Sequence, residues 1–159
     1  MQRFRRFRLQ RGMTLIEVIV AFSILLLLTS MAVPLARYRV HRQKESDLRL
    51  ALREISAAID KFKDASDQNL LGPVKADTDG YPESLQQLVD GIEIANSADG
   101  KKIKFLRRIP SDPFTGKREW GVRSTRDDPD STSWGGQNVF SVYTKTYERA
   151  ADGTPYSQW

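Results

Sequence analysis

The sequence contains no cysteine and a single histidine, His41, in 159 residues. Without cysteine the chain can form no disulfide, and it offers no thiolate for a zinc site or for nucleophilic catalysis. His41 lies among basic residues at positions 39, 42 and 44, which indicates a charged surface and not a catalytic base. The serines have no evident triad partners, and no glycine-rich phosphate loop is present. These absences predict a protein that is not an enzyme.

Acidic residues are missing from the segment that ends at Gly12, and this local absence sets the net charge of the chain. The formal charge is +5, because 25 Lys and Arg face 20 Asp and Glu, and five arginines before Gly12 equal the excess. The remainder is formally neutral, which argues against a nucleic-acid partner. Such a leader suits the cytoplasmic side of a membrane with its anionic lipids. The five residues are Arg3, Arg5, Arg6, Arg8 and Arg11.

Charge is nearly absent from residues 13–36, where Glu17 is the sole charged side chain. As a helix, the run from Met13 to Val33 would extend about 32 Å, close to the thickness of a bilayer core. The sequence therefore predicts a single-pass membrane helix over 13–36. The simplest topology keeps the leader, 1–12, in the cytoplasm and places 37–159 across the membrane.

The helix is expected to continue beyond Pro34, which removes one helical hydrogen bond and introduces a kink without ending the helix. Apolar residues then recur at spacings of four and three, the pattern of one buried helix face. We therefore predict one helix from near Met13 to about Ala65. The stripe consists of Leu48, Leu52, Ile55, Ile59 and Phe62.

The second half of the chain predicts short elements separated by turns. A short helix is expected with Pro82 in its first turn and Gly91 as its stop. Three strand candidates follow, and together they would form a small antiparallel sheet packed on the apolar stripe. The predicted class is α+β, with a long N-terminal helix whose second half carries this sheet. The strand candidates are Ile103 to Ile109, Lys117 to Ser124 and Val139 to Thr144.

The segment RGMTLIE, residues 11–17, resembles the processing site of type IV pilins and pseudopilins. This resemblance implies that a prepilin peptidase cuts after Gly12 and methylates the new amino terminus at Met13. Glu17 then stands fifth in the mature chain, and Pro34 also falls at a position typical of the family. Most members begin with Phe, so Met13 is a departure that keeps the apolar character.

The chemistry of the motif accounts for its residue types. Gly12 has no side chain to obstruct an extended backbone in a protease. An acidic residue at the centre of a membrane helix costs about 3 kcal/mol, and less near the interface where Glu17 would lie. The resemblance supplies a partner for this carboxylate, namely the positive terminal amine of a neighbouring subunit.

Three further segments resemble the major pseudopilin of type II secretion systems: YPESLQQLV, LRRIPSDPFTGKREWGV and DGTPYSQW. This resemblance implies a type IV pilin-like fold and a filament of copies of the chain in the periplasm. It also implies minor pseudopilins and an inner-membrane assembly platform as partners, with the unassembled subunit in the inner membrane.

Other interpretations stay open. The apolar run is also compatible with a secretory signal peptide cut after Ser30-Met31-Ala32, although Glu17 within the run and the length of the run argue against it. It is compatible as well with a plain single-pass anchor in which Glu17 is incidental. For function, the alternatives are a type IV pilin of a surface fibre, for adhesion, motility or DNA uptake, and a signal-anchored periplasmic binding domain that does not polymerise.

The resemblance also implies a calcium ion, which the family often carries in a loop near its carboxy terminus. Several aspartates there are oxygen donors of the kind that calcium prefers. Their spacing is not that of an EF-hand, and the family's usual calcium-loop sequence is not evident. The sequence favours a solvated turn cluster over a metal site and leaves calcium as a candidate. The residues concerned are Asp127, Asp128, Asp130 and Asp152.

Overall fold

The computed structural model of the chain describes residues 13–95, 97 and 99–159. Its contacts divide the chain into two compact units, Met1–Arg42 and Gln43–Trp159. The helices are α1 (Leu15–Asp67) and α2 (Leu85–Asp90), with 3-10 turns η1 (Ala76–Thr78) and η2 (Tyr156–Gln158). The strands are β1 (Ile92–Glu93), β2 (Lys102–Ile103), β3 (Gly121–Arg123) and β4 (Ser141–Tyr143).

Helix α1 confirms the long helix predicted from near Met13 to about Ala65. Thr14 begins it, because the Thr14 Oγ1 atom accepts a hydrogen bond from the Glu17 amide at 3.3 Å. A threonine at this position satisfies one of the amides that a helix leaves free at its start. Pro34 lies within the helix, and the kink expected there stays a prediction.

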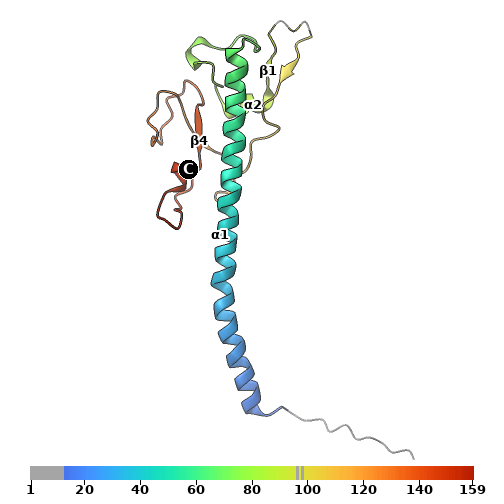
Figure 1. Cartoon of the computed structure of the whole chain (residues 1–159), viewed down its shortest axis with the longest axis vertical. Helices are drawn as coiled ribbons and strands as arrows, with labels where there is room; N and C mark the ends of the chain where they lie inside the picture. The colour runs from blue at the N-terminus through green and yellow to red at the C-terminus, as the bar shows by residue number, and fades with distance from the viewer. Residues whose placement is uncertain (1–12, 96, 98) are drawn as a thin grey trace, which may run out of the picture. The chain divides into compact units, whose positions relative to one another are not determined.

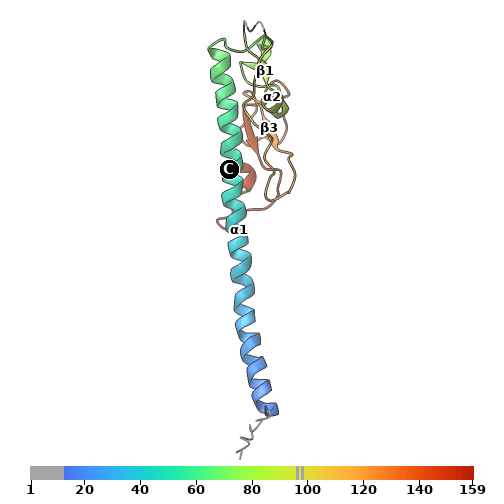
Figure 2. The ribbon, with the colours of Figure 1, turned by 90° about the vertical axis from the view of Figure 1, so that its right-hand side faces the viewer.

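The apolar stripe of α1 is buried as predicted. Leu48, Ile55 and Phe62 are 0% exposed, while the flanking charged residues of the same helix face solvent. In the unit Gln43–Trp159, the shorter elements pack on one side of α1, as Figure 2 shows. Phe62 also meets the ring of Phe105 edge-on at 5.3 Å, which extends the core beyond the helix.

The strands form two separate sheets of two strands each, and not the single sheet of three expected strands. In the view of Figure 1, β4 lies to the left of α1 and β1 to its right, and Figure 2 shows that both sheets lie over the same side of the helix. The expected strand from Ile103 to Ile109 is wrong beyond Ile103, which pairs with Ile92. Further along, the amides of Phe105 and Leu106 donate to the Leu88 carbonyl at 2.9 and 3.0 Å. This segment therefore caps the end of α2 instead of extending a sheet.

Strands β3 and β4 lie within the two other predicted strand segments, although each is shorter than expected. Gly121 is paired with Tyr143 across this sheet. A Cβ atom at Gly121 would lie 2.2 Å from the Tyr143 ring, so only glycine leaves room for the aromatic side chain. The close approach of ring and backbone explains why this strand begins with glycine.

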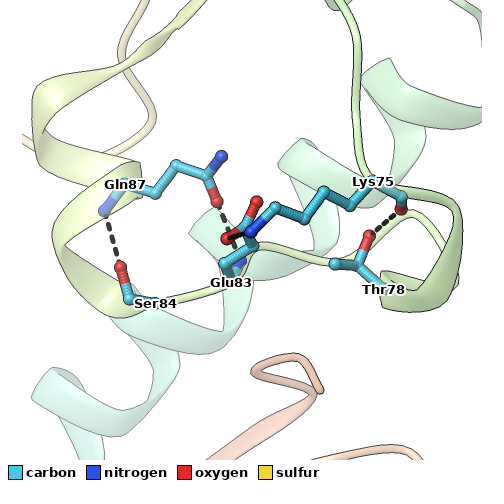
Figure 3. Close-up of polar contacts among 5 residues, drawn as sticks. All are labelled: Lys75, Thr78, Glu83, Ser84 and Gln87. Carbon is cyan, nitrogen blue, oxygen red and sulfur yellow. Dashed lines mark hydrogen bonds and ion pairs between the residues drawn. The ribbon is translucent and has the colours of Figure 1, made fainter. Parts of the chain in front are cut away.

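Helix α2 is shorter than predicted, because Ser84 and not Pro82 occupies its start. Figure 3 shows the Ser84 Oγ atom accepting from the Gln87 amide, while Gln87 Oε1 accepts from the Glu83 amide at 2.8 Å. These reciprocal bonds satisfy amides at the helix start. Gly91 ends α2 as predicted, with a φ of 81° that favours glycine.

Figure 3 also shows the contacts that hold the turn between Lys75 and Glu83, just before α2. Lys75 Nζ and Glu83 Oε2 form an ion pair at 2.6 Å, and the Thr78 hydroxyl donates to the Lys75 carbonyl at 2.8 Å. Thr78 is 1% exposed, so this turn is part of the packed interior. The segment that resembles the pseudopilin element YPESLQQLV is thus an ordered turn followed by a capped helix.

Candidate functional site

The processing motif leads directly into the first turn of α1. Gly12 and the leader, 1–12, lie outside the described residues, whereas Met13 is described and 74% exposed. Glu17 lies in the first helical turn, where a carboxylate interacts favourably with the positive end of the helix dipole. Within the described part of the chain, no hydrogen bond or ion pair reaches the Glu17 carboxylate.

Glu17 is surrounded by exposed apolar side chains that no other part of the described chain covers. The positions fall on every face of α1, so the helix presents an apolar surface all round. The described residues contain no helix that combines the length and apolar character of a bilayer-crossing segment. The exposed side chains are Leu15, Ile16, Ile19, Val20, Phe22, Ile24, Leu25, Leu26, Leu27 and Leu28.

The hydroxyl groups in the apolar stretch are satisfied by their own helix. Ser23, Thr29 and Ser30 donate to backbone carbonyls three or four residues earlier, at 2.7 to 2.8 Å. Such bonds allow a hydroxyl to enter an apolar environment without a further partner. Glu17 differs from them because its carboxylate has no such internal bond.

The pseudopilin-like segment LRRIPSDPFTGKREWGV is organised by Asp112, which is 0% exposed. Its Oδ1 atom accepts from the Phe114 amide at 2.8 Å, and its Oδ2 atom accepts from the Thr144 hydroxyl. Asp112 therefore shapes the turn after Pro110 and fastens it to the end of β4. The indole of Trp120 donates to the Pro110 carbonyl at 3.0 Å and holds the other side of the turn.

The carboxy-terminal segment forms an aromatic clasp on α1, made of Phe114, Tyr156 and Trp159. Tyr156 stacks on Phe114 at 4.4 Å and meets Trp159 edge-on at 4.7 Å. The guanidinium of Arg49, on α1, lies 4.1 Å from the Trp159 ring centroid. Trp159 is thus a packed anchor, and the clasp joins the chain end to the long helix.

The loop between β3 and β4 is held by buried polar residues that the sequence did not single out. Arg123, 8% exposed, donates to the Ser131 carbonyl at 2.8 Å and lies 4.0 Å from the Tyr143 ring centroid. Asn138, 0% exposed, donates to the Thr78 carbonyl at 2.9 Å. No spacing or composition signal marked either residue.

The four candidate calcium ligands do not gather in one place. Across residues 13–95, 97 and 99–159, no group of three or more His, Cys, Asp or Glu side chains is arranged to hold a metal. Asp127 accepts from the Ser124 and Gly135 amides, and these bonds hold its pKa below the usual value. Asp152 accepts from the Thr154 amide at 2.9 Å, which likewise lowers its pKa. The other two, Asp128 and Asp130, are exposed.

The tail loop that contains Asp152 is closed by hydrogen bonds among its own residues. The Arg149 guanidinium donates to the Gly153 carbonyl at 3.0 Å, and the Ala150 amide donates to the Thr154 carbonyl at 2.9 Å. The positively charged Arg149 guanidinium thus already binds the Gly153 carbonyl, which a calcium ion beside Asp152 would need as a ligand. The residues around Asp152 therefore do not fit a calcium ion.

Comparison with known proteins identifies the amino-terminal segment. The family described as "Prokaryotic N-terminal methylation motif" matches residues 7–33, which include Gly12, Met13 and Glu17. No curated protein and no solved structure matches the chain. The motif is a feature of structural, pilin-type proteins and not of an enzyme class. It supports a type IV pilin-like protein, in agreement with the long α1 packed on small antiparallel sheets.

Proposed function

We propose that this protein is a structural subunit that polymerises into the periplasmic pseudopilus of a type II protein secretion system. In this role it drives the export of folded proteins across the outer membrane. The observation that carries the proposal is the methylation motif over residues 7–33, joined to a helix start where no described residue pairs with the Glu17 carboxylate and the apolar side chains around it are exposed.

The proposed maturation follows from the motif. A prepilin peptidase removes the leader, 1–12, and methylates the amine of Met13. Residues 13–36 then serve as the transmembrane and assembly helix, with the amino terminus at the cytoplasmic face of the inner membrane. Residues 37–159 form the periplasmic domain, which includes the amphipathic second half of α1. The apolar composition of 13–36 and the motif match support this topology.

The proposed assembly step pairs two charges in an apolar environment. The Met13 amine of one subunit keeps its positive charge on methylation and meets the Glu17 carboxylate of its neighbour. A lone carboxylate in hydrocarbon is costly, so pairing favours one register of adjacent helices. The apolar side chains from Leu15 to Leu28, exposed in the single chain, would be covered by other copies in the filament.

Three sequence elements support the type II assignment over a surface pilus. YPESLQQLV corresponds to the turn and capped helix α2, and LRRIPSDPFTGKREWGV contains the turn that the buried Asp112 organises beside β4. The third element, DGTPYSQW, forms the chain end whose Tyr156 and Trp159 belong to the aromatic clasp. The assignment implies minor pseudopilins and the inner-membrane assembly platform as partners. A type IV pilin of a surface fibre shares the amino-terminal motif and is the alternative within the family. A non-polymerising periplasmic binding domain is the alternative of another class.

The maturation step has a direct test. The chain is produced in a host that has prepilin peptidase, and its intact mass and terminal sequence are measured. We expect a mature chain that begins at Met13 with a methylated amine. A chain that begins at Val33 would instead establish a secretory signal peptide and overturn the proposal.

The type II role is tested by deleting the gene in a bacterium that carries it. We expect loss of export of folded proteins into the medium, with surface motility retained and export restored by the wild-type gene. Loss of motility with normal export would support the surface pilus instead. Overproduction should also yield filaments, and their absence would favour the non-polymerising domain.

A further inference from the structure

Three arginines follow closely after the apolar part of α1. Arg37, Arg39 and Arg42 are all exposed, and the sequence has no acidic residue between Glu17 and Glu45 to offset their charge. Among the described residues, no ion pair reaches any of the three side chains. Segments that cross a membrane usually carry few basic residues next to the apolar span, so this cluster calls for a partner.

The spacing along α1 places the cluster about one bilayer thickness away from Glu17. Both Glu17 and Tyr38 belong to this one helix, and the rise between them is about 32 Å, close to the thickness of a hydrocarbon core. When Glu17 lies at one interface, Tyr38 and its basic neighbours therefore lie at the other. Tyrosine is enriched at such interfaces, and Tyr38 is 53% exposed, so its ring is available to this layer.

Arg42 is directed toward the membrane side of the cluster. Its guanidinium carbon lies 5.1 Å from the centroid of the Tyr38 ring, one helical turn closer to the apolar segment. Helical side chains lean toward the amino terminus, so Arg42 brings its charge back to the level of Tyr38. A long basic side chain can cover apolar surface with its stem and keep its charge among polar groups. The charges of Arg37, Arg39 and Arg42 thus fall in one layer.

The arginines are distributed around the helix and do not form a single face. At about 100° per residue, Arg37 and Arg39 point about 160° apart, and Arg42 lies about 60° from Arg39. A globular partner or a neighbouring helix contacts one face of a helix at a time. A layer of lipid headgroups surrounds a membrane helix and can neutralise charges in every direction. The distribution therefore favours lipid over a protein partner.

We propose that Arg37, Arg39 and Arg42, together with Tyr38, bind the phosphate groups of anionic phospholipids at the periplasmic face of the membrane. This inference rests on the membrane topology of the proposed function and adds a lipid partner to it. A guanidinium suits this ligand, because its planar N–H groups match two phosphate oxygens. Bound lipid fixes the depth of the unassembled subunit in the bilayer and so holds Glu17 at the opposite interface.

The test measures the lipid preference of the full-length chain in phosphatidylcholine bilayers. Trace spin-labelled phosphatidylglycerol or spin-labelled phosphatidylcholine is added, and electron spin resonance gives the fraction of each that the protein immobilises. The five arginines before Gly12 are changed to Gln in every sample, because they would also bind anionic lipid. This parent chain should prefer phosphatidylglycerol by about fivefold, the usual effect of one basic residue near an anionic surface. In the triple variant Arg37→Gln, Arg39→Gln, Arg42→Gln, the ratio should fall close to one.

Two matched variants separate the effect of charge from other effects. Replacement of the same three arginines by Lys keeps the charge and should retain most of the preference. Replacement of Arg107, Arg118 and Arg126 by Gln removes an equal charge from exposed positions in the unit Gln43–Trp159 and should leave the preference unchanged. Salt at about 1 M shortens the Debye length to about 3 Å and should reduce the preference of the parent chain.

The outcomes separate this inference from the proposed function. Flotation with the vesicles shows whether the chain enters the bilayer, and a chain that does not float overturns the proposed topology and the inference with it. A chain that floats without a preference for phosphatidylglycerol, or whose triple Gln variant keeps the preference, overturns the inference alone. An equal loss in the control variant of the unit Gln43–Trp159 also overturns it. The measurement needs neither cleavage after Gly12 nor filaments, so a positive result stands even if the pseudopilus assignment fails.

Discussion

The phenol of Tyr156 donates a hydrogen bond to Glu45 Oε1 at 2.7 Å and joins residues 111 positions apart. Tyr156 is 0% exposed, and its ring lies between Phe114 and Trp159. Burial raises the pKa of the phenol above its usual value, and the hydrogen bond to Glu45 raises it further. The aromatic clasp therefore places a neutral, buried hydroxyl against α1, where it determines how the chain end packs.

Tyr156→Phe should destabilise the domain by about 1.5 to 3 kcal/mol, the usual contribution of a hydrogen bond to a charged group. The ring stays in place, so packing against Phe114 is retained and the loss reports the hydroxyl alone. Denaturant unfolding of a fragment that begins near Arg37 measures the change. Tyr147→Phe is the matched control, because Tyr147 is 100% exposed and its hydroxyl should contribute almost nothing.

The same hydroxyl predicts a dependence of stability on alkaline pH. The folded-state pKa of Tyr156 lies above its usual value of 10.0, so the folded chain retains a proton that the unfolded chain releases. Its contribution is fully present below pH 10 and is lost as the pH rises toward the folded-state pKa. The free energy of unfolding of the wild-type fragment should therefore fall more steeply above pH 10 than that of Tyr156→Phe. Parallel curves for the two proteins would contradict this.

The long helix could be predicted from the sequence because its signals are local and repeated. The stripe from Leu48 to Phe62 follows the helical period over four turns, and burial along one face requires that period. The motif around Glu17 is likewise a short run of contiguous residues. The apolar stripe and the motif around Glu17 can therefore both be recognised without knowledge of the rest of the chain.

The segment after Ile103 could not be predicted in the same way, because its partner is distant and irregular. The apolar residues at 103, 105 and 109 are compatible with one face of a strand, yet the Phe105 and Leu106 amides donate to the Leu88 carbonyl at the end of α2. Arg123 and Asn138 were missed because a buried polar residue is recognised by its partners, and those partners are scattered over the chain.

Phe62→Ala should destabilise the fragment that begins near Arg37 by about 3 kcal/mol or more, because Phe62 is fully buried and its removal leaves a cavity. We expect the wild-type fragment to be soluble, monomeric and folded, since residues 43–159 contain the whole buried core. Leu50→Ala on the same helix is the control: Leu50 is 57% exposed, and its removal should change stability little. Equal effects of the two substitutions in thermal unfolding would be incompatible with the stripe as the core.

Glu17→Ala should leave membrane insertion intact and should block or misregister filament assembly. The substitution removes a charge from the apolar segment, so insertion becomes easier, and only the pairing between subunits is lost. Glu17→Gln keeps the size of the side chain and should fail in the same way if charge is what matters. Filament yield by electron microscopy and membrane fractionation measure the two steps separately. Normal filaments from the alanine variant would remove this role from Glu17.

Asp112 offers a test of the turn that carries the second pseudopilin-like segment. Asp112→Ala leaves the Phe114 amide and the buried Thr144 hydroxyl without their acceptor, and each lost partner typically costs about 1 to 3 kcal/mol. Asp112→Asn should recover much of the loss, because its amide oxygen can still accept from the Phe114 amide and its N–H can donate to a rotated Thr144 hydroxyl.

The control for Asp112 is Asp130→Ala, at an exposed position, which should have almost no effect on stability. Denaturant midpoints of the three variants should therefore fall in the order Asp130→Ala, Asp112→Asn, Asp112→Ala from most to least stable. If Asp112→Asn were as unstable as Asp112→Ala, the negative charge itself, and not its hydrogen bonds, would be what the turn requires.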